Sequence, residues 1–156
     1  EAYLGVNDKA SHAYNNKFTP KTKPMYEDGG ISYIYLCYGI HYLFNIVTNI
    51  KNIPHAILIR AIKPLKGINT MLKRRKFSKI IKELTDGPGK LTQALGITTK
   101  LNKESLIGNK IWIEDQEIKF EKKDILSSPR IGVDYAGDDA KLPYRFYINN
   151  NKWVSK

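Results

Sequence analysis

The chain has 156 residues, a length that suits one domain with one hydrophobic core. No stretch reaches the roughly 20 apolar residues that span a bilayer, so we expect no membrane segment. One cysteine, Cys37, excludes an internal disulfide, and the three histidines show no ligand spacing, so we expect no metal site.

The charge is strongly positive, with 26 Lys and Arg against 15 Asp and Glu and a net charge of +11. This balance favours an anionic partner such as nucleic acid or a membrane surface. Compositional drift toward Lys, Ile and Asn is an equally good explanation of the charge alone. Drift does not explain why seven of the ten tyrosines lie between Tyr3 and Tyr42.

The first third of the chain predicts a hairpin that follows a long loop. Residues 1–6 indicate the end of a strand, and the polar residues 7–30 predict an ordered loop. Residues 31–37 and 40–48 are rich in β-branched and aromatic types, which favours two strands. Tyr38-Gly39 between them predicts a turn, because glycine tolerates a positive φ. An aromatic side chain is therefore expected near the hairpin tip.

The remainder of the chain predicts mixed elements. Residues 55–62 indicate a buried strand that carries one charge, Arg60, and apolar spacing predicts a helix from Ile68 to Leu84. Asp86-Gly-Pro-Gly89 opens a second helix, Lys90 to Leu95. Shorter elements are expected at residues 102–106 (a helix), 110–114 and 117–121 (a second hairpin), and 130–134 and 144–148 (strands).

These elements predict one α+β domain over residues 1–156, with a mainly antiparallel curved sheet, flanking helices and a protruding β-hairpin. We expect that further sequence precedes Glu1, because the first strand lacks its beginning.

Three features could carry chemistry. Glu1 stands beside Tyr3, Arg60 interrupts an apolar strand, and Tyr38 marks a hairpin tip. A buried Arg needs an anionic partner, which a simple structural ion pair would also provide. An exposed aromatic tip is suited to insertion between DNA base steps, although a protein partner would also explain it. For each tyrosine taken alone, core packing is the more common role.

A weaker signal is Asp86-Gly-Pro-Gly-Lys90, which is similar to a phosphate-binding helix start with free amides and a lysine. It lacks the glycine spacing of a P-loop and the Ser or Thr that follows its lysine.

Many short motifs occur in a characteristic order along almost the whole chain. They are Glu1-Ala-Tyr-Leu-Gly5, Asp8, Ala10-Ser-His12, Thr19-Pro20, Met25, Tyr33-Ile-Tyr35, Tyr38-Gly39, Asn45, Leu58-Ile-Arg-Ala61, Pro64-Leu65, Gly67, Gly87-Pro88, Lys90-Leu91, Gln93-Ala-Leu95, Ile97, Arg130-Ile-Gly-Val133, Ala136-Gly137, Pro143, Arg145-Phe-Tyr147 and Trp153-Val-Ser155. In this order and spacing, the chain resembles the alkyladenine (3-methyladenine) DNA glycosylase family. Residues 98–125 are the part that the resemblance does not align.

The resemblance implies a monofunctional DNA glycosylase without a cofactor or lyase activity. Such an enzyme flips alkylated or deaminated purines out of duplex DNA and cuts the N-glycosidic bond with water, leaving an abasic site. It implies a monomer that acts on damaged double-stranded DNA, in the cytoplasm or nucleoid of a bacterium or in the nucleus of a eukaryote.

The resemblance also implies roles for individual residues. These are Glu1 as the general base, Arg60 and the Val133 carbonyl as further ligands of the water, Tyr3, His12, Tyr35 and Asn45 as the base pocket, Tyr38 as the wedge, and Thr19, Gly87 and Lys90 as contacts to the DNA backbone.

Several alternatives stay open at this point. His12 could act as a general acid for neutral lesions or have only a structural role, and Lys90 could form a Schiff base and give lyase activity. The main rival function is a non-enzymatic nucleic-acid-binding module. A formyltransferase-like domain would give no reason for Glu1, Arg60 and the hairpin tip to converge.

Overall fold

A computed structural model of the protein describes residues 1–155. Its strands are β1 (Ala2–Tyr3), β2 (Ser32–Cys37), β3 (His41–Val47), β4 (Ala56–Leu58), β5 (Ile125–Ser128) and β6 (Arg145–Ile148). Its α-helices are α1 (Ile68–Arg75) and α2 (Pro88–Leu95). Short 3-10 helices are η1 (Gly5–Asn7), η2 (Tyr14–Asn16), η3 (Lys23–Tyr26), η4 (Lys82–Leu84), η5 (Thr99–Leu101), η6 (Lys122–Asp124) and η7 (Asp134–Lys141).

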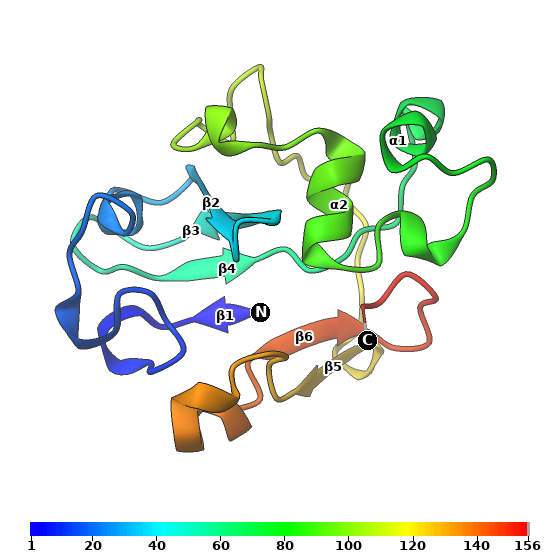
Figure 1. The fold of residues 1–156 in the computed structure, drawn as a ribbon. Coiled ribbons are helices and arrows are strands. Elements are labelled where there is room, and N and C mark those ends of the chain that lie inside the picture. The colour runs from blue at the N-terminus through cyan, green and yellow to red at the C-terminus, as the bar shows by residue number, and fades with distance from the viewer. Residues whose placement is uncertain (156) are drawn as a thin grey trace.

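The strands form two antiparallel sheets, so the predicted α+β class is confirmed. A four-stranded sheet has the order β1-β4-β3-β2, and β5 pairs with β6 in a second sheet beside it (Figure 1). Helices α1 and α2 lie together at one end of the larger sheet. In the part of the chain that the structure describes, no helix is long and apolar enough to cross a membrane.

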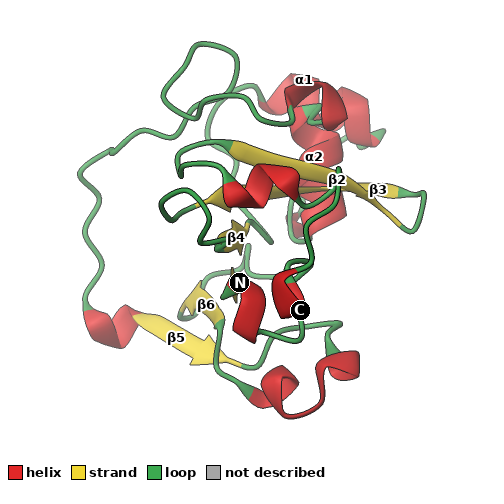
Figure 2. Cartoon of the chain, turned by 90° about the vertical axis from the view of Figure 1, so that its left-hand side faces the viewer, coloured by secondary structure: helices red, strands yellow, loops and turns green. Residues whose placement is uncertain are grey.

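The predicted hairpin is formed by β2 and β3, and it projects past α2 (Figure 2). Its turn is closed by the Ile40 amide, which donates to the Cys37 carbonyl at 3.0 Å. Tyr38 and Gly39 at the centre of the turn have φ of 50° and 71°. Positive φ at both positions matches the twist of antiparallel strands, so the tip is tight and Tyr38 is 90% exposed.

Alternation along β2 divides the side chains between the two faces of the sheet. Ile34 packs with Phe44, Ile97 and Leu106 on the face that α2 covers. Tyr33 packs on the other face, in a cluster that includes residues of the segment 7–30. The long polar loop therefore forms the second layer over the sheet, and a cavity described below lies on that side.

The predicted helix over residues 68–84 is wrong beyond Arg75. Lys76 adopts a left-handed conformation with φ of 56°, and its amide donates to the Leu72 and Lys73 carbonyls. The chain then reverses, and the Phe77 amide donates to the Leu72 carbonyl at 3.0 Å. Phe77 packs on the cluster around Leu84 and Trp153. This non-local packing ends the helix although the apolar spacing continues.

The prediction for the strand at residues 55–62 was too long, because β4 ends at Leu58 and Arg60 lies just beyond it. The helix expected at residues 102–106 is absent. The Asn102 side chain instead accepts a hydrogen bond from the Ile34 amide at 2.9 Å, which gives a backbone donor on the outer edge of β2 a partner.

Two further expectations were wrong. Residues 110–114 and 117–121 form no hairpin; only an isolated bridge joins Ile107 and Trp112. Residues 130–134 are a loop in which Gly132 has φ of 75°, and the strand that pairs with β6 is β5, just before it. The strand expected at residues 144–148 is confirmed as β6.

Candidate active site

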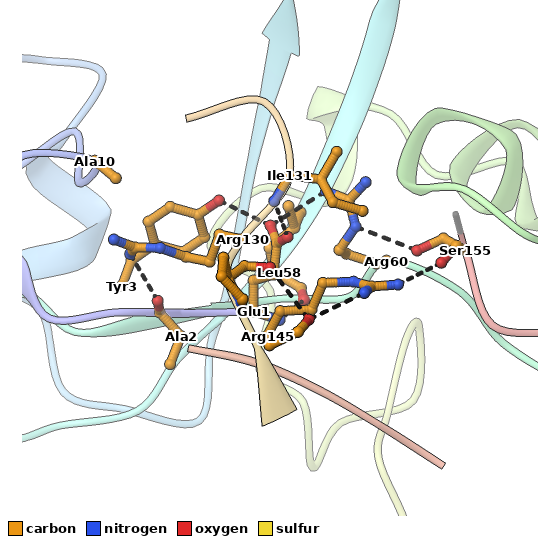
Figure 3. A network of polar contacts seen from close by, with 12 residues as sticks. Glu1, Ala2, Tyr3, Ala10, Leu58, Arg60, Arg130, Ile131, Arg145 and Ser155 are labelled. Carbon is orange, nitrogen blue, oxygen red and sulfur yellow. Dashed lines mark hydrogen bonds and ion pairs between the residues drawn. The ribbon is translucent and has the colours of Figure 1, made fainter. Parts of the chain in front are cut away.

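The Glu1 side chain lies in the interior, with none of its surface exposed. Its Oε2 accepts hydrogen bonds from Arg60 Nη1 at 3.2 Å and from the Tyr3 hydroxyl at 3.0 Å (Figure 3). Its Oε1 accepts the Ile131 amide at 2.8 Å. Three donors from separate parts of the chain thus hold one carboxylate in a fixed orientation.

Strand pairing brings Glu1 and Arg60 together. The Glu1 and Leu58 backbones exchange two hydrogen bonds, of 3.0 Å and 2.8 Å, as β1 joins β4. Arg60 follows Leu58 by two residues, so its side chain returns to the same face as the Glu1 side chain. Arg60 therefore has the anionic partner that its apolar surroundings require.

The segment near residue 155 holds the other side of the Arg60 guanidinium. Arg60 Nε donates to the hydroxyl of Ser155 at 3.3 Å, and Arg145 donates to the Ser155 carbonyl (Figure 3). Ser155 is buried. Arg60 is thus fixed between Glu1 and Ser155, which limits the directions in which its remaining donors can point.

A second buried ion pair, between Arg130 and Asp8, lies next to Glu1. Arg130 donates to the two Asp8 oxygens at 2.5 Å and 2.9 Å and to the Ala2 carbonyl at 2.9 Å. Its guanidinium also lies 4.8 Å from the centre of the Tyr3 ring. Arg130 therefore fixes the backbone next to Ile131, whose amide binds Glu1.

Burial by itself would raise the pKa of the Asp8 carboxyl. The hydrogen bonds from Arg130 and from the Leu4 and Ala10 amides outweigh burial, and the pKa of Asp8 lies below its ordinary value. Asp8 is thus ionised in the folded protein at neutral pH.

An aromatic cavity of about 620 Å³ adjoins this carboxylate cluster. The volume lies within the range of small-molecule sites. Glu1 does not line the cavity, but its partners Tyr3 and Arg60 do. The predicted residues found in the wall are Tyr3, His12, Tyr35, Tyr38, Asn45, Arg60 and Val133.

His12 makes two contacts through its ring nitrogens. Nδ1 lies 2.8 Å from the Tyr33 hydroxyl, and Nε2 lies 3.5 Å from Lys21 Nζ. Burial, followed by the charges of Lys21 and Lys17, lowers the pKa of His12 to about 4. His12 is therefore neutral at pH 7, which disfavours a role as a general acid and supports the structural alternative.

Tyr33 and Tyr35 stand side by side on β2, with ring centres 5.4 Å apart. Burial raises the pKa of both phenols, so they stay protonated at any physiological pH. Next to them, the Asn45 amide is fixed by donation to the Tyr33 carbonyl at 3.1 Å. Across the cavity, the Val133 carbonyl accepts the Ala136 amide at 2.8 Å, which leaves one lone pair.

Comparison with known proteins identifies the family. The model of the family described as Methylpurine-DNA glycosylase (MPG) matches residues 1–152. The chain belongs to this methylpurine-DNA glycosylase family. Its resemblance to the 3-methyladenine DNA glycosylases is thereby confirmed, and with it a place in DNA repair.

Two bacterial relatives carry the provisional name 3-methyladenine DNA glycosylase. The protein from Chlamydia felis is 50% identical over 153 residues, which cover 97% of this chain and 77% of the relative. The protein from Clostridium novyi is 43% identical over 163 aligned residues, covering all of this chain and 80% of the relative.

The residues predicted to touch the DNA backbone in this methylpurine-DNA glycosylase lie in two places. Thr19 is bonded to Thr22 within the loop layer, through its amide at 2.8 Å. Gly87 caps the start of α2, and Lys90 Nζ donates to Asp86 at 2.7 Å. A phosphate contact by Lys90 would thus have to share that lysine with Asp86.

Sequence reasoning missed several cavity residues that lie outside the strands. Lys21, Ile131, Gly132 and Tyr135 line the wall, and Tyr135 is 70% exposed with its hydroxyl bonded to the Ala10 carbonyl at 3.3 Å. These residues follow no apolar period, so only their position after Thr19-Pro20, or within or just after the Arg130 motif, could have signalled them.

Proposed function

We propose that this methylpurine-DNA glycosylase flips an alkylated or deaminated purine out of duplex DNA and hydrolyses its N-glycosidic bond with water activated by Glu1. The observation that carries the proposal is the buried Glu1–Arg60 pair beside a cavity walled by tyrosines. A buried carboxylate held next to an aromatic slot suits a reaction in which a flat base departs and a sugar cation forms.

In the proposed reaction, a water enters between Tyr3 and Arg60, which both line the cavity. Glu1 accepts one proton as the water oxygen bonds to C1′ of the sugar. Arg60 and the free lone pair of the Val133 carbonyl orient the water. The bond between C1′ and the base breaks, and the base leaves with the electron pair. The negative Glu1 also stabilises the oxocarbenium character of the sugar.

The base pocket favours electron-poor rings. An alkylated purine carries a positive charge, and the neutral faces of Tyr3 and Tyr35 attract it by about 0.5–2 kcal/mol. The same charge makes the base a good leaving group, so that no acid is required. Asn45, fixed by the Tyr33 carbonyl, is proposed to oppose the 2-amino group of normal guanine.

We propose that the enzyme is a monomer without lyase activity and that it works on the nucleoid of a bacterial cell, as expected from its bacterial relatives. Lyase activity needs an unprotonated amine as nucleophile, whereas Lys90 is held in an ion pair with Asp86.

Product analysis tests the function. Duplexes that each carry one lesion (3-methyladenine, 7-methylguanine, hypoxanthine or ethenoadenine) are incubated with the protein. We expect free base and an intact strand that alkali then breaks at the abasic site. Strand breakage without alkali, with a borohydride-trapped adduct, would show a lyase. Binding without any base release would favour the nucleic-acid-binding module.

Tyr38→Ala tests the wedge. Because Tyr38 is 90% exposed at the hairpin tip, its loss should not unfold the protein, but the gap left by a flipped base would stay unfilled. We expect kcat/KM on duplex DNA to fall by roughly 10- to 100-fold, since unstacking costs a few kcal/mol. Single-turnover kinetics on duplex and single-stranded substrates measure the effect.

Tyr14→Ala is the matched control, since Tyr14 is also exposed and does not line the cavity. An equal loss on single-stranded and duplex substrates in Tyr38→Ala would argue against a wedge.

A further inference from the structure

Lys21 has no part in the proposed reaction, yet it lines the cavity and lies close to two aromatic rings of the cavity wall. Nζ lies 3.5 Å from His12 Nε2 and 4.6 Å from the centre of the Tyr35 ring. We propose that Lys21 is a specificity-determining residue, which fixes the His12 proton on Nδ1 and thereby turns the Tyr33 hydroxyl proton toward the flipped base. This inference rests on the proposed function.

The direction of the hydrogen bonds follows from counting donors and acceptors. A lysine ammonium has three donors and no acceptor, so His12 Nε2 must present its lone pair to Lys21. In a neutral imidazole the proton is then on Nδ1. Nδ1 donates to the Tyr33 oxygen at 2.8 Å, and the Tyr33 hydroxyl proton needs another acceptor.

Lys21 carries the charge that this argument requires. Burial lowers the pKa of Lys21, but the ordinary value for a lysine is about three units above neutral. The face of the Tyr35 ring stabilises the ammonium form through its cation–π contact.

The other groups around His12 support a neutral ring. Tyr33 and Tyr35 face it from β2, and burial raises the pKa of both, so they supply no negative charge. Lys21 and Lys17 face it from the loop layer, and both oppose protonation. None of these neighbours is acidic. Burial, followed by the two lysine charges, therefore lowers the pKa of His12 to about 4.

A buried hydroxyl that points its proton into a cavity selects its ligand. Tyr33 is 2% exposed, so a base without an acceptor opposite this hydroxyl would leave a buried donor unpaired. The pocket would thus select a base by two criteria: an electron-poor ring face for stacking, and one acceptor ring nitrogen on the edge of the base. The requirement for an edge acceptor would let the pocket bind uncharged lesions as well. Stacking on tyrosine faces that attract cations would not by itself hold an uncharged base.

The first test reads the imidazole directly and does not require activity. Protein labelled with ¹⁵N-histidine is studied by long-range ¹H–¹⁵N correlation from pH 5 to 8, with His12→Gln to assign the signal. We expect an Nδ1–H tautomer that does not protonate in this range. Lys21→Met, which keeps the aliphatic stem, should raise the pKa of His12 and populate the other tautomer, whereas Lys21→Arg should behave like the wild type.

The second test measures binding to duplexes that contain hypoxanthine or its 3-deaza or 7-deaza analogue, each of which lacks one ring acceptor. We expect the wild type to disfavour one analogue by roughly tenfold. Lys21→Met and Tyr33→Phe should both reduce this preference to near unity, and Lys21→Arg should keep it.

An Nε2–H tautomer in the wild type, an unchanged tautomer in Lys21→Met, or equal binding of all three duplexes would each overturn the inference. A protein that releases no base but shows the expected tautomer and binding preference would refute the proposed function and leave the role of Lys21 standing.

Discussion

Glu1→Gln is expected to abolish base release and to leave the binding of lesion-containing DNA nearly unchanged. Glutamine keeps an oxygen to accept the Ile131 amide, and it has the same shape, but it cannot take a proton from water. General-base catalysis contributes about 10²- to 10⁴-fold, and losing the negative charge beside the sugar cation adds to that loss. Single-turnover release of 7-methylguanine, together with a gel-shift Kd, measures both quantities.

Glu27→Gln is the matched control, because Glu27 forms a half-exposed ion pair with Lys103 away from the cavity. It should keep wild-type rates. If Glu1→Gln kept more than a tenth of the wild-type rate, Glu1 would not be the general base, and another group would have to activate the water.

Arg130→Met should give the largest loss of stability. Neither Arg130 nor Asp8 is more than 2% exposed at the side chain, and the variant leaves the Asp8 carboxylate buried without its cation. Removing one partner of a buried pair costs about 3–5 kcal/mol. Urea unfolding at pH 7 measures the loss, which should shrink as the pH falls.

The pH dependence follows from the lowered pKa of Asp8 in the folded protein. Its contribution to stability is complete above the ordinary aspartate pKa of about 3.9, and it is lost as the pH falls through the lower folded value. In the variant the cation is gone, so Asp8 can become neutral at a higher pH, and the two proteins converge in acid.

A double variant, Asp8→Leu with Arg130→Met, removes both charges and should be more stable than Arg130→Met alone. Lys141→Met breaks an exposed pair with Asp138 and should have little measurable effect. An Arg130→Met variant as stable as the wild type would show that Asp8 finds solvent or another donor.

Local patterns in the sequence predicted the elements that are stabilised mainly by residues close together in the sequence. The hairpin follows from two β-favouring runs around Tyr38-Gly39, and α2 follows from its flanking glycines. The pattern failed where distant contacts decide, as at Lys76, where packing of Phe77 on the cluster around Leu84 and Trp153 ends α1. No short-range signal indicates such an end.

The same division applies to the site. The resemblance placed Glu1 beside Arg60, and the two form an ion pair in the structure. The bond between Arg130 and Asp8 joins residues 122 positions apart, and no spacing along the chain indicates it. Lys21 and Tyr135 stayed unassigned for this reason, since tertiary packing alone brings the loop of Lys21 and helix η7 of Tyr135 to the cavity.

The backbone of Tyr38 links the fold to evolution of the enzyme. A left-handed conformation such as its φ of 50° costs a residue other than glycine about 1–2 kcal/mol. Glycine or asparagine would relieve the cost, so selection for a sturdier hairpin alone would favour replacing the tyrosine. If the Tyr38 ring fills the gap left by a flipped base as proposed, DNA repair favours tyrosine at this position, whereas hairpin stability favours glycine or asparagine. Substitutions that restore the lost stability should then arise elsewhere in the hairpin.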